Sequence, residues 1–266
     1  MTILSPERVA EYWDRGYVNR IPVLTPAEVA HFRAEFDRIE AEQDEAHGGL
    51  WIDRHFTPWK QRSHPFEDWF IELAVHPRIL DAVEAILGPD ILVRNGDVFT
   101  KDVGGEEGVR WHVDSAMDGQ DVNGILTAWI GLSPSTIENG CIQFAVATHR
   151  DPHTRGDIDS LALDHDEVKF VENRELAWNV MEPGELSLHH FHLAHRSLNN
   201  QTDVRRVGYV LRYMSPDITQ ETAQAGAAML ARGRDRTRKF SLKPNFPVTW
   251  DVDKDRKAAF LASAES

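Results

Sequence analysis

The stretch Val109-Arg110-Trp111-His112-Val113-Asp114-Ser115 places a histidine and a carboxylate two residues apart in a segment compatible with an extended strand. Successive side chains of a strand point to opposite faces, so His112 and Asp114 share one face if the segment is extended. His195 and Arg206 follow downstream, the histidine at the end of a β-like run and the arginine just before another. The stretch therefore predicts a β scaffold with a polar, metal-binding face.

The segments around this stretch are also strand-like. After residue 90, short runs rich in β-branched and aromatic residues alternate with turn residues such as Asn139-Gly140 and Pro183-Gly184. Several short strands with such punctuation predict a sandwich or jelly roll. The predicted strands are Ile91–Phe99, Ile125–Leu132, Cys141–Val146, Ala177–Met181, Leu186–Phe191 and Val207–Met214.

Helical signals dominate both ends of the chain. Ser5-Pro6 and Thr25-Pro26-Ala27-Glu28 each combine an N-cap residue with proline at the first helical position. We expect one domain over residues 1–266, made of a mostly helical layer (1–90), a β core (91–215) and a helical and extended tail (216–266). The other elements expected at the two ends are a strand at Tyr17–Leu24 and helices at Pro65–Ala74, Pro77–Leu87, Ala223–Arg232 and Asp253–Ala264, with Phe240–Trp250 extended.

Composition narrows the class of protein. Of the 266 residues, 41% are hydrophobic and 27% charged, which is ordinary for a globular chain. The net charge of −14 argues against general nucleic-acid binding, which needs Lys and Arg to neutralise phosphates. Cys141 is the one cysteine, so no intramolecular disulfide can form, which suits a reducing compartment. No apolar leader and no apolar run of about 18 residues is visible, so we expect a cytoplasmic protein without a membrane span.

The second half of the metal pattern is ambiguous from spacing alone. The run that ends at His195 also holds His189, His190 and His192. Two imidazoles and one carboxylate on one face of a metal leave open positions, as in non-haem Fe(II) oxygenases. The same donors also suit Zn(II), so ligand type does not settle the metal.

An arginine near the last predicted strand suggests what the open positions bind. A guanidinium matches a carboxylate with two parallel hydrogen bonds and stays charged when buried. Arg206 could therefore anchor the remote carboxylate of an oxo-acid cosubstrate. Arg205 and Arg212 are the neighbouring candidates, and strand alternation places Arg206 and Arg212 on one face and Arg205 on the other.

Ordered motifs run roughly from Leu92 to Met214: Trp111-His112-Val113-Asp114, Thr127-Ala128-Trp129-Ile130-Gly131-Leu132, Glu138-Asn139-Gly140-Cys141-Ile142, Thr148-His149-Arg150, His195-Arg196-Ser197-Leu198-Asn199-Asn200 and Arg206. Together they resemble the phytanoyl-CoA dioxygenase (PhyH) family. The resemblance implies a mainly β fold with flanking helices and a double-stranded β-helix core of the jelly-roll, cupin-like type. It also implies Fe(II) as the metal, with 2-oxoglutarate and O2 as cosubstrates.

The resemblance extends to single residues. The family's iron ligands match His112, Asp114 and His195. Its arginine for the far carboxylate of 2-oxoglutarate matches Arg206, and a hydroxyl that helps hold that carboxylate matches Ser197. The other expected cofactor contacts are Trp129, near the cosubstrate, and the more loosely matched Asn95, Thr127 and Lys101.

Some positions depart from the family pattern. Val113 stands where many relatives have glutamine, and Ala145-Val146-Ala147-Thr148-His149 replaces the usual Pro-Gly-Ser-His ending. Both departures could reshape the substrate side. Halogenases of the family replace the carboxylate ligand by a small residue, so the presence of Asp114 implies oxygenation.

These features lead to an expected activity and to its alternatives. We expect hydroxylation of an unactivated C–H bond of a small molecule, a metabolic or natural-product intermediate, with release of succinate and CO2. The alternatives are another outcome at the same iron (desaturation, epoxidation, cyclisation or halogenation), a non-catalytic cupin-like metal-binding protein, and a zinc hydrolase. The protein would act as a monomer or homodimer. Candidates near the substrate are Trp51, His55, Phe56, Trp59, Lys60, Trp111, Ser115, Met117, Asp118, Gln120 and the loop Asp151–Lys169, read as a lid or a solvated loop.

Overall fold

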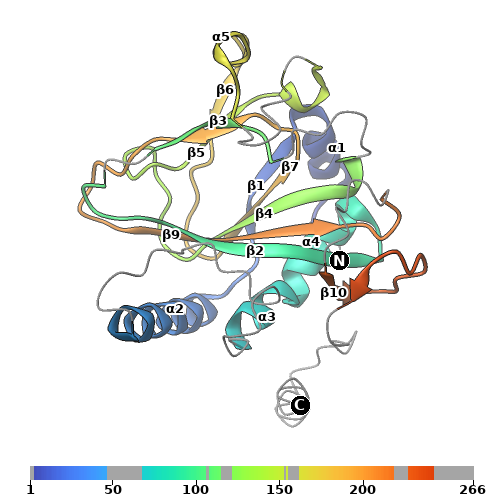
Figure 1. Cartoon of the computed structure of the whole chain (residues 1–266), viewed down its shortest axis with the longest axis horizontal. Helices are drawn as coiled ribbons and strands as arrows, with labels where there is room; N and C mark the ends of the chain where they lie inside the picture. The colour runs from blue at the N-terminus through green and yellow to red at the C-terminus, as the bar shows by residue number, and fades with distance from the viewer. Residues whose placement is uncertain are drawn as a thin grey trace.

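Two facing β-sheets form the body of the protein (Figure 1). The computed structural model describes residues 3–46, 68–105, 108–114, 122–152, 154, 162–218 and 227–242. The large sheet has the order β1-β7-β4-β9-β2-β10-β11, and the small sheet the order β3-β8-β5-β6. The large-sheet strands are β1 (Tyr17–Pro22), β2 (Ile91–Lys101), β4 (Ile125–Gly131), β7 (Glu185–His190), β9 (Arg206–Met214), β10 (Ala227–Arg232) and β11 (Ser241–Leu242). The small-sheet strands are β3 (Val109–His112), β5 (Ile142–Ala145), β6 (Leu176–Trp178) and β8 (His195–Ser197). The predicted mainly β class with flanking helices is confirmed.

Helices cover the face of the large sheet that is turned away from the small one (Figure 1). Alternate strand residues such as Leu126, Ala128 and Ile130 pack there against the helices, in the largest core cluster. Burying aliphatic side chains in this way contributes roughly 1.5–3 kcal/mol per residue. These helices are α2 (Pro26–Ala46), α3 (Asp68–Ala74) and α4 (Pro77–Leu87), whereas α1 (Pro6–Arg15) lies beside β1 and β7 at the edge of the sheet (Figure 1).

The helix starts follow the predicted capping signals. The Ser5 side chain accepts from the backbone N–H of Arg8, and α1 ends at Gly16 in the left-handed region with φ 85°. Thr25 and Glu28 form a reciprocal cap at the start of α2, each side chain accepting from the other's backbone N–H. These caps fix where the helical layer meets the sheet.

A second apolar cluster lies between the two sheets. Its members come from β1 and β4 on one side and from β5 on the other, and Tyr17 stacks on Phe144 with ring centroids 4.6 Å apart. The inward face of the large sheet is therefore apolar at this end. Polar side chains occupy the same face closer to β3 and β8, where the site lies.

Two predicted segments are wrong in part. The helix expected over Ala223–Arg232 is the strand β10 from Ala227 onward, which pairs antiparallel with β2. Met229 and Ala231 face the helices while Ala228 joins a different cluster, so long-range pairing overrides the local preference of alanine and leucine for helix. The loop expected over Asp151–Lys169 contains the start of α5 (His165–Glu172).

Two arginines near the C-terminal end of the described chain form ion pairs with acidic residues on or next to α4. Arg232 pairs with Asp81 at 2.8 Å and with Glu84 at 2.7 Å, both on α4, and Arg236 lies 3.4 Å from Asp90. These ion pairs attach β10 and the chain after it to the helical layer. Among the described residues, no helix combines the length and apolar character needed to cross a membrane.

Candidate active site

His112 and His195 lie opposite each other in the small sheet. They are Cα partners across β3 and β8, and their ring centroids are 4.0 Å apart. Asp114 follows β3, where its backbone N–H donates to the carbonyl of Phe191 at 3.0 Å. One ligand atom from each of these three side chains lies within 4.8 Å of the others, a spacing that one metal ion can bridge. The structure thus brings the predicted triad together.

Backbone carbonyls fix the tautomer of both imidazoles. Nδ1 of His112 lies 2.8 Å from the carbonyl of Arg110, and Nδ1 of His195 lies 2.8 Å from the carbonyl of Leu193. A carbonyl can only accept, so both Nδ1 atoms carry the proton and both Nε2 lone pairs remain for a metal. Burial, reinforced by the neighbouring His112, lowers the pKa of His195 well below its usual value and keeps that ring neutral.

Asp114 is surrounded by three side chains of the large sheet. The Thr127 hydroxyl donates to Oδ2 at 2.5 Å, Arg212 donates to Oδ1 at 3.4 Å, and Nε2 of His189 lies 3.4 Å from Oδ2. Burial alone would raise the pKa of Asp114, but Arg212 and the contact with His189 outweigh it and hold the pKa well below its usual value. The donor set is therefore two imidazoles and one carboxylate, which fits Fe(II).

A pocket of about 470 Å³ lies beside the triad, and Arg206 is part of its wall. Arg206 is 3% exposed, donates from Nη1 to the carbonyl of Gly140, and lies with Cζ 5.5 Å above the Trp129 ring. Burial lowers the pKa of Arg206 to about 10, so the guanidinium stays charged at neutral pH. Its Nε is buried without a hydrogen-bond partner among the described residues. A bound carboxylate would satisfy that donor.

The floor of the pocket near Arg206 depends on a glycine. A Cβ on Gly208 of β9 would lie 2.1 Å from Cζ2 of Trp129, so only glycine lets the indole ring lie flat on the strand. Ser197 on β8 is 5% exposed and lines the same pocket. Trp129, Ser197 and Arg206 therefore line the same pocket, as expected of residues that contact one cosubstrate.

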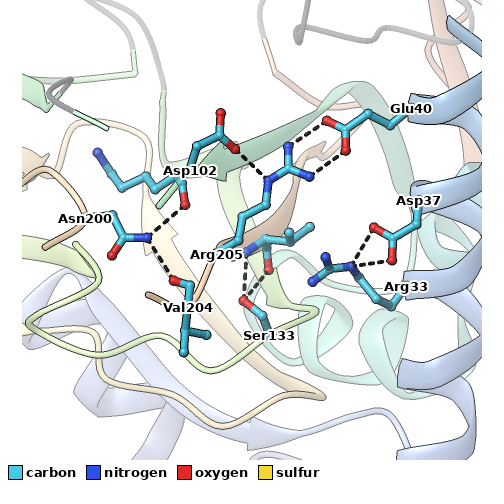
Figure 2. A network of polar contacts seen from close by, with 10 residues as sticks. Arg33, Asp37, Glu40, Asp102, Ser133, Asn200, Val204 and Arg205 are labelled. Carbon is cyan, nitrogen blue, oxygen red and sulfur yellow. Dashed lines mark hydrogen bonds and ion pairs between the residues drawn. The ribbon is translucent and has the colours of Figure 1, made fainter. Parts of the chain in front are cut away.

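Arg205 points away from this pocket, although it is adjacent to Arg206 in the chain. Figure 2 shows its guanidinium between Glu40 of α2 and Asp102, with contacts of 2.5 and 2.6 Å to Glu40 and 2.6 Å to Asp102. Arg212, by contrast, lines the pocket together with Arg206. Arg206 and Arg212 therefore share one face of β9, as expected, whereas Arg205 precedes the strand and contacts α2.

The other expected cosubstrate contacts differ in position. Thr127 lines the pocket but contacts Asp114, and Lys101, the Cα partner of Arg206, is not one of the lining residues. The backbone of Asn95 pairs with Arg212, and its side chain lies outside the described part of the structure.

The expected substrate contacts are only partly visible. Trp111 and Val113 pack on the outer side of the small sheet against α5, because strand alternation turns them away from His112. The valine at position 113, where many relatives have glutamine, therefore does not line the pocket beside the triad. The remaining candidates Trp51, His55, Phe56, Trp59, Lys60, Ser115, Met117, Asp118 and Gln120 lie outside the described residues, as do residues 153 and 155–161 of the loop.

His189 and Arg212 both contact Asp114, a role that was predicted for neither of them. Both are direct cross-strand neighbours of Thr127, His189 on β7 and Arg212 on β9. His189 is 1% exposed, and neither ring nitrogen has a hydrogen-bond partner among the described residues. The alternation of His189 and Thr127 with apolar residues was a signal, but only the register between strands shows that they converge.

Comparison with known proteins agrees with this geometry. A family model described as phytanoyl-CoA dioxygenase (PhyH) matches residues 12–208. The peroxisomal phytanoyl-CoA dioxygenase of Mus musculus is 25% identical over 238 residues, 81% of this chain and 70% of that protein. Dioxygenase lolE1 of Epichloe uncinata is 26% identical over 127 residues, which cover 48% of this chain. The matched region spans 47% of the length of lolE1, about half.

A solved structure resembles the whole chain. The nickel complex of ThoJ, a non-heme monooxygenase, is 25% identical, with a TM-score of 0.71 and coverage of 97% of this chain and 96% of ThoJ. The family model covers about three quarters of the chain, and a His-Asp-His cluster is in place. The predicted enzyme class, a 2-oxoglutarate-dependent dioxygenase with Fe(II), is confirmed at the level of the family. The protein belongs to the phytanoyl-CoA dioxygenase family.

Proposed function

We propose that the protein hydroxylates an unactivated C–H bond of a small molecule, with conversion of 2-oxoglutarate and O2 to succinate and CO2. In this proposal His112, Asp114 and His195 hold Fe(II). One observation carries it: the three ligands and the buried, charged Arg206 line the same pocket. A metal site alone would not need a buried guanidinium with an unpartnered N–H at the other end of the pocket.

Each residue of the pocket has a separate task. The two imidazoles and Asp114 would hold the metal, which would leave room in the pocket for the cosubstrate and O2. Arg206 and Ser197 bind the far carboxylate of 2-oxoglutarate, and Trp129 supports the guanidinium from below. When bound, iron and 2-oxoglutarate supply the oxidising power, with one oxygen atom of O2 ending in succinate and the other in the hydroxylated product.

The carboxylate ligand favours oxygenation over halogenation. Asp114 is present, anionic and hydrogen-bonded by Thr127, so the position that a halide would need is already occupied. Zinc would accept the same donors, so the match of residues 12–208 to a dioxygenase family is what favours an oxygenase over a zinc hydrolase. A small-molecule substrate, action as a monomer or homodimer and a cytoplasmic location stay predictions.

A substrate screen with two readouts tests the proposal. The purified protein, loaded with Fe(II) under anaerobic conditions, is exposed to O2, 2-oxoglutarate and candidate small molecules, and succinate and product mass are measured. We expect substrate-dependent succinate and a product 16 mass units heavier, roughly one oxygen atom. His112→Ala should abolish both signals. Substrate-coupled succinate from the His112→Ala variant would overturn the assignment of the triad.

A further inference from the structure

Three polar side chains in one row of the large sheet converge on one carboxylate, that of Asp114. His189 on β7, Thr127 on β4 and Arg212 on β9 are direct Cα partners across adjacent strands. All three side chains lie at the same end of the pocket, next to Asp114. The closest contact is the hydroxyl of Thr127, at 2.5 Å from Oδ2.

Asp114 needs such support because the strand ladder does not supply it. The β3 strand ends at His112, so Asp114 lies just beyond the strand and is tied by its own N–H only to Phe191. A metal ligand must be held within a fraction of an ångström of its productive position. The orientation of this carboxylate must therefore come from side-chain contacts.

We propose that Thr127 is a positioning residue for the metal ligand Asp114, and not a contact of the cosubstrate. The inference rests on the proposed function of the triad. Thr127 is 2% exposed, and as a β-branched residue it has few side-chain conformations, so its hydroxyl is a fixed reference point.

The side chains of Thr127 and Arg212 together fix the plane of the Asp114 carboxylate. Arg212 donates to Oδ1 while Thr127 donates to Oδ2, so the carboxylate is held at both oxygens. An ionised carboxylate offers about four acceptor positions, and these two hydrogen bonds leave lone pairs for a metal. His189 lies 3.4 Å from the oxygen that Thr127 binds and closes the third side.

Metal affinity, measured without turnover, separates this role from cosubstrate binding. Ni(II) binding to the metal-free protein is measured by calorimetry for wild type, Thr127→Val and Thr127→Ser, followed by 2-oxoglutarate binding at saturating Ni(II). Valine has the shape of threonine without the hydroxyl, and serine restores the hydroxyl. Ser197→Ala, at another residue of the pocket wall, is the matched control.

We expect Thr127→Val to weaken Ni(II) binding roughly 10- to 100-fold, as loss of a hydrogen bond to a metal ligand does, and Thr127→Ser to recover most of it. The visible spectrum of the Co(II) protein should change in Thr127→Val, since the ligand geometry changes. Ser197→Ala should leave the Ni(II) affinity unchanged and weaken 2-oxoglutarate binding.

Two results would overturn the inference: Ni(II) binding by Thr127→Val as tight as wild type, or a loss confined to 2-oxoglutarate binding. If Thr127→Val does not fold, the Ni(II) affinity of Thr127→Ala is measured instead, and the same two results would overturn the inference. Failure of the wild-type protein to bind Ni(II) would instead contradict the proposed function itself.

Discussion

His112 and His195 face each other as Cα partners across β3 and β8, with ring centroids 4.0 Å apart. Because each supplies one lone pair to the same point, neither can replace the other. We expect His195→Ala to abolish stoichiometric binding of a divalent metal, measured by metal analysis after dialysis. His31→Ala, at a half-exposed histidine on α2, is the control and should bind one equivalent. Full metal occupancy in His195→Ala would contradict the ligand assignment.

Arg206 and Arg205 make a matched pair because adjacent strand residues point to opposite faces. Arg206→Gln should raise the dissociation constant of 2-oxoglutarate roughly 100-fold, since charge-assisted hydrogen bonds contribute about 1.5–3 kcal/mol. Arg205→Gln should change that constant little. Binding is measured by calorimetry on the Ni(II)-loaded proteins. Equal effects of the two substitutions would rule out Arg206 as the specific anchor.

Arg205 is expected to act on stability instead. Its guanidinium joins α2 to the chain after β2 through Glu40 and Asp102 (Figure 2). Breaking this partly buried network by Arg205→Gln should lower the free energy of unfolding by about 1–3 kcal/mol in urea titrations. Arg33→Gln removes a more exposed pair with Asp37 within α2 and should cost less than about 0.5 kcal/mol. A larger loss for Arg33→Gln would show that the network does not anchor the helix.

Gly208 should be intolerant of any side chain. A Cβ there would meet the Trp129 ring at 2.1 Å, and relief of such overpacking costs about 1–3 kcal/mol. Gly208→Ala should displace the indole ring and weaken 2-oxoglutarate binding about tenfold. The control is Gly131→Ala on the partner strand, where a Cβ would lie 3.3 Å from the carbonyl oxygen of Glu182 and 3.4 Å from Cζ3 of Trp129, and so would touch the ring without displacing it. Unchanged cosubstrate affinity in Gly208→Ala would show that Trp129 does not shape that end of the pocket.

His190 should make the fold sensitive to acid. Burial, with the nearby His149 and His192, lowers its pKa to about 3, and its Nδ1 accepts from the backbone N–H of His192. Below about pH 6.5 His190 is protonated in the unfolded chain but not in the folded protein. The free energy of unfolding therefore falls as the pH falls, down to about pH 3. Between pH 7 and pH 5, His190 alone should lower the free energy of unfolding by about 2 kcal/mol.

The non-titrating variant His190→Gln isolates that contribution. The free energy of unfolding is measured in urea at pH 7 and pH 5 for both proteins. We expect the drop to be about 2 kcal/mol smaller in His190→Gln, because the other histidines are common to both chains. Equal drops would mean that His190 is protonated in the folded protein near neutral pH.

Part of the site could be predicted because it depends on local geometry. Alternation along an extended segment predicts that His112 and Asp114 share a face, and the two side chains do converge although β3 ends at His112. The choice among four histidines does not follow from spacing, because the chain crosses from the large sheet to the small sheet between His190 and His195. Only the family resemblance selected His195 before the structure placed it.

Other features depend on contacts between distant segments. The place of Thr127 beside Asp114 requires the register of β4 with β7 and β9, which no local pattern encodes. The β10 strand likewise exists because β2 pairs with it. The start of α5 was visible in the sequence, since Asp164 and Glu167 form a capping box.

The most direct test of the central claim is the visible spectrum of the protein with Fe(II) and 2-oxoglutarate in the absence of O2. A cosubstrate that chelates ferrous iron gives a weak metal-to-ligand charge-transfer band. We predict that the band forms with one equivalent of Fe(II) in wild type, needs far more 2-oxoglutarate in Arg206→Gln, and is absent in His195→Ala. No band in wild type, or an undiminished band in His195→Ala, would contradict the account.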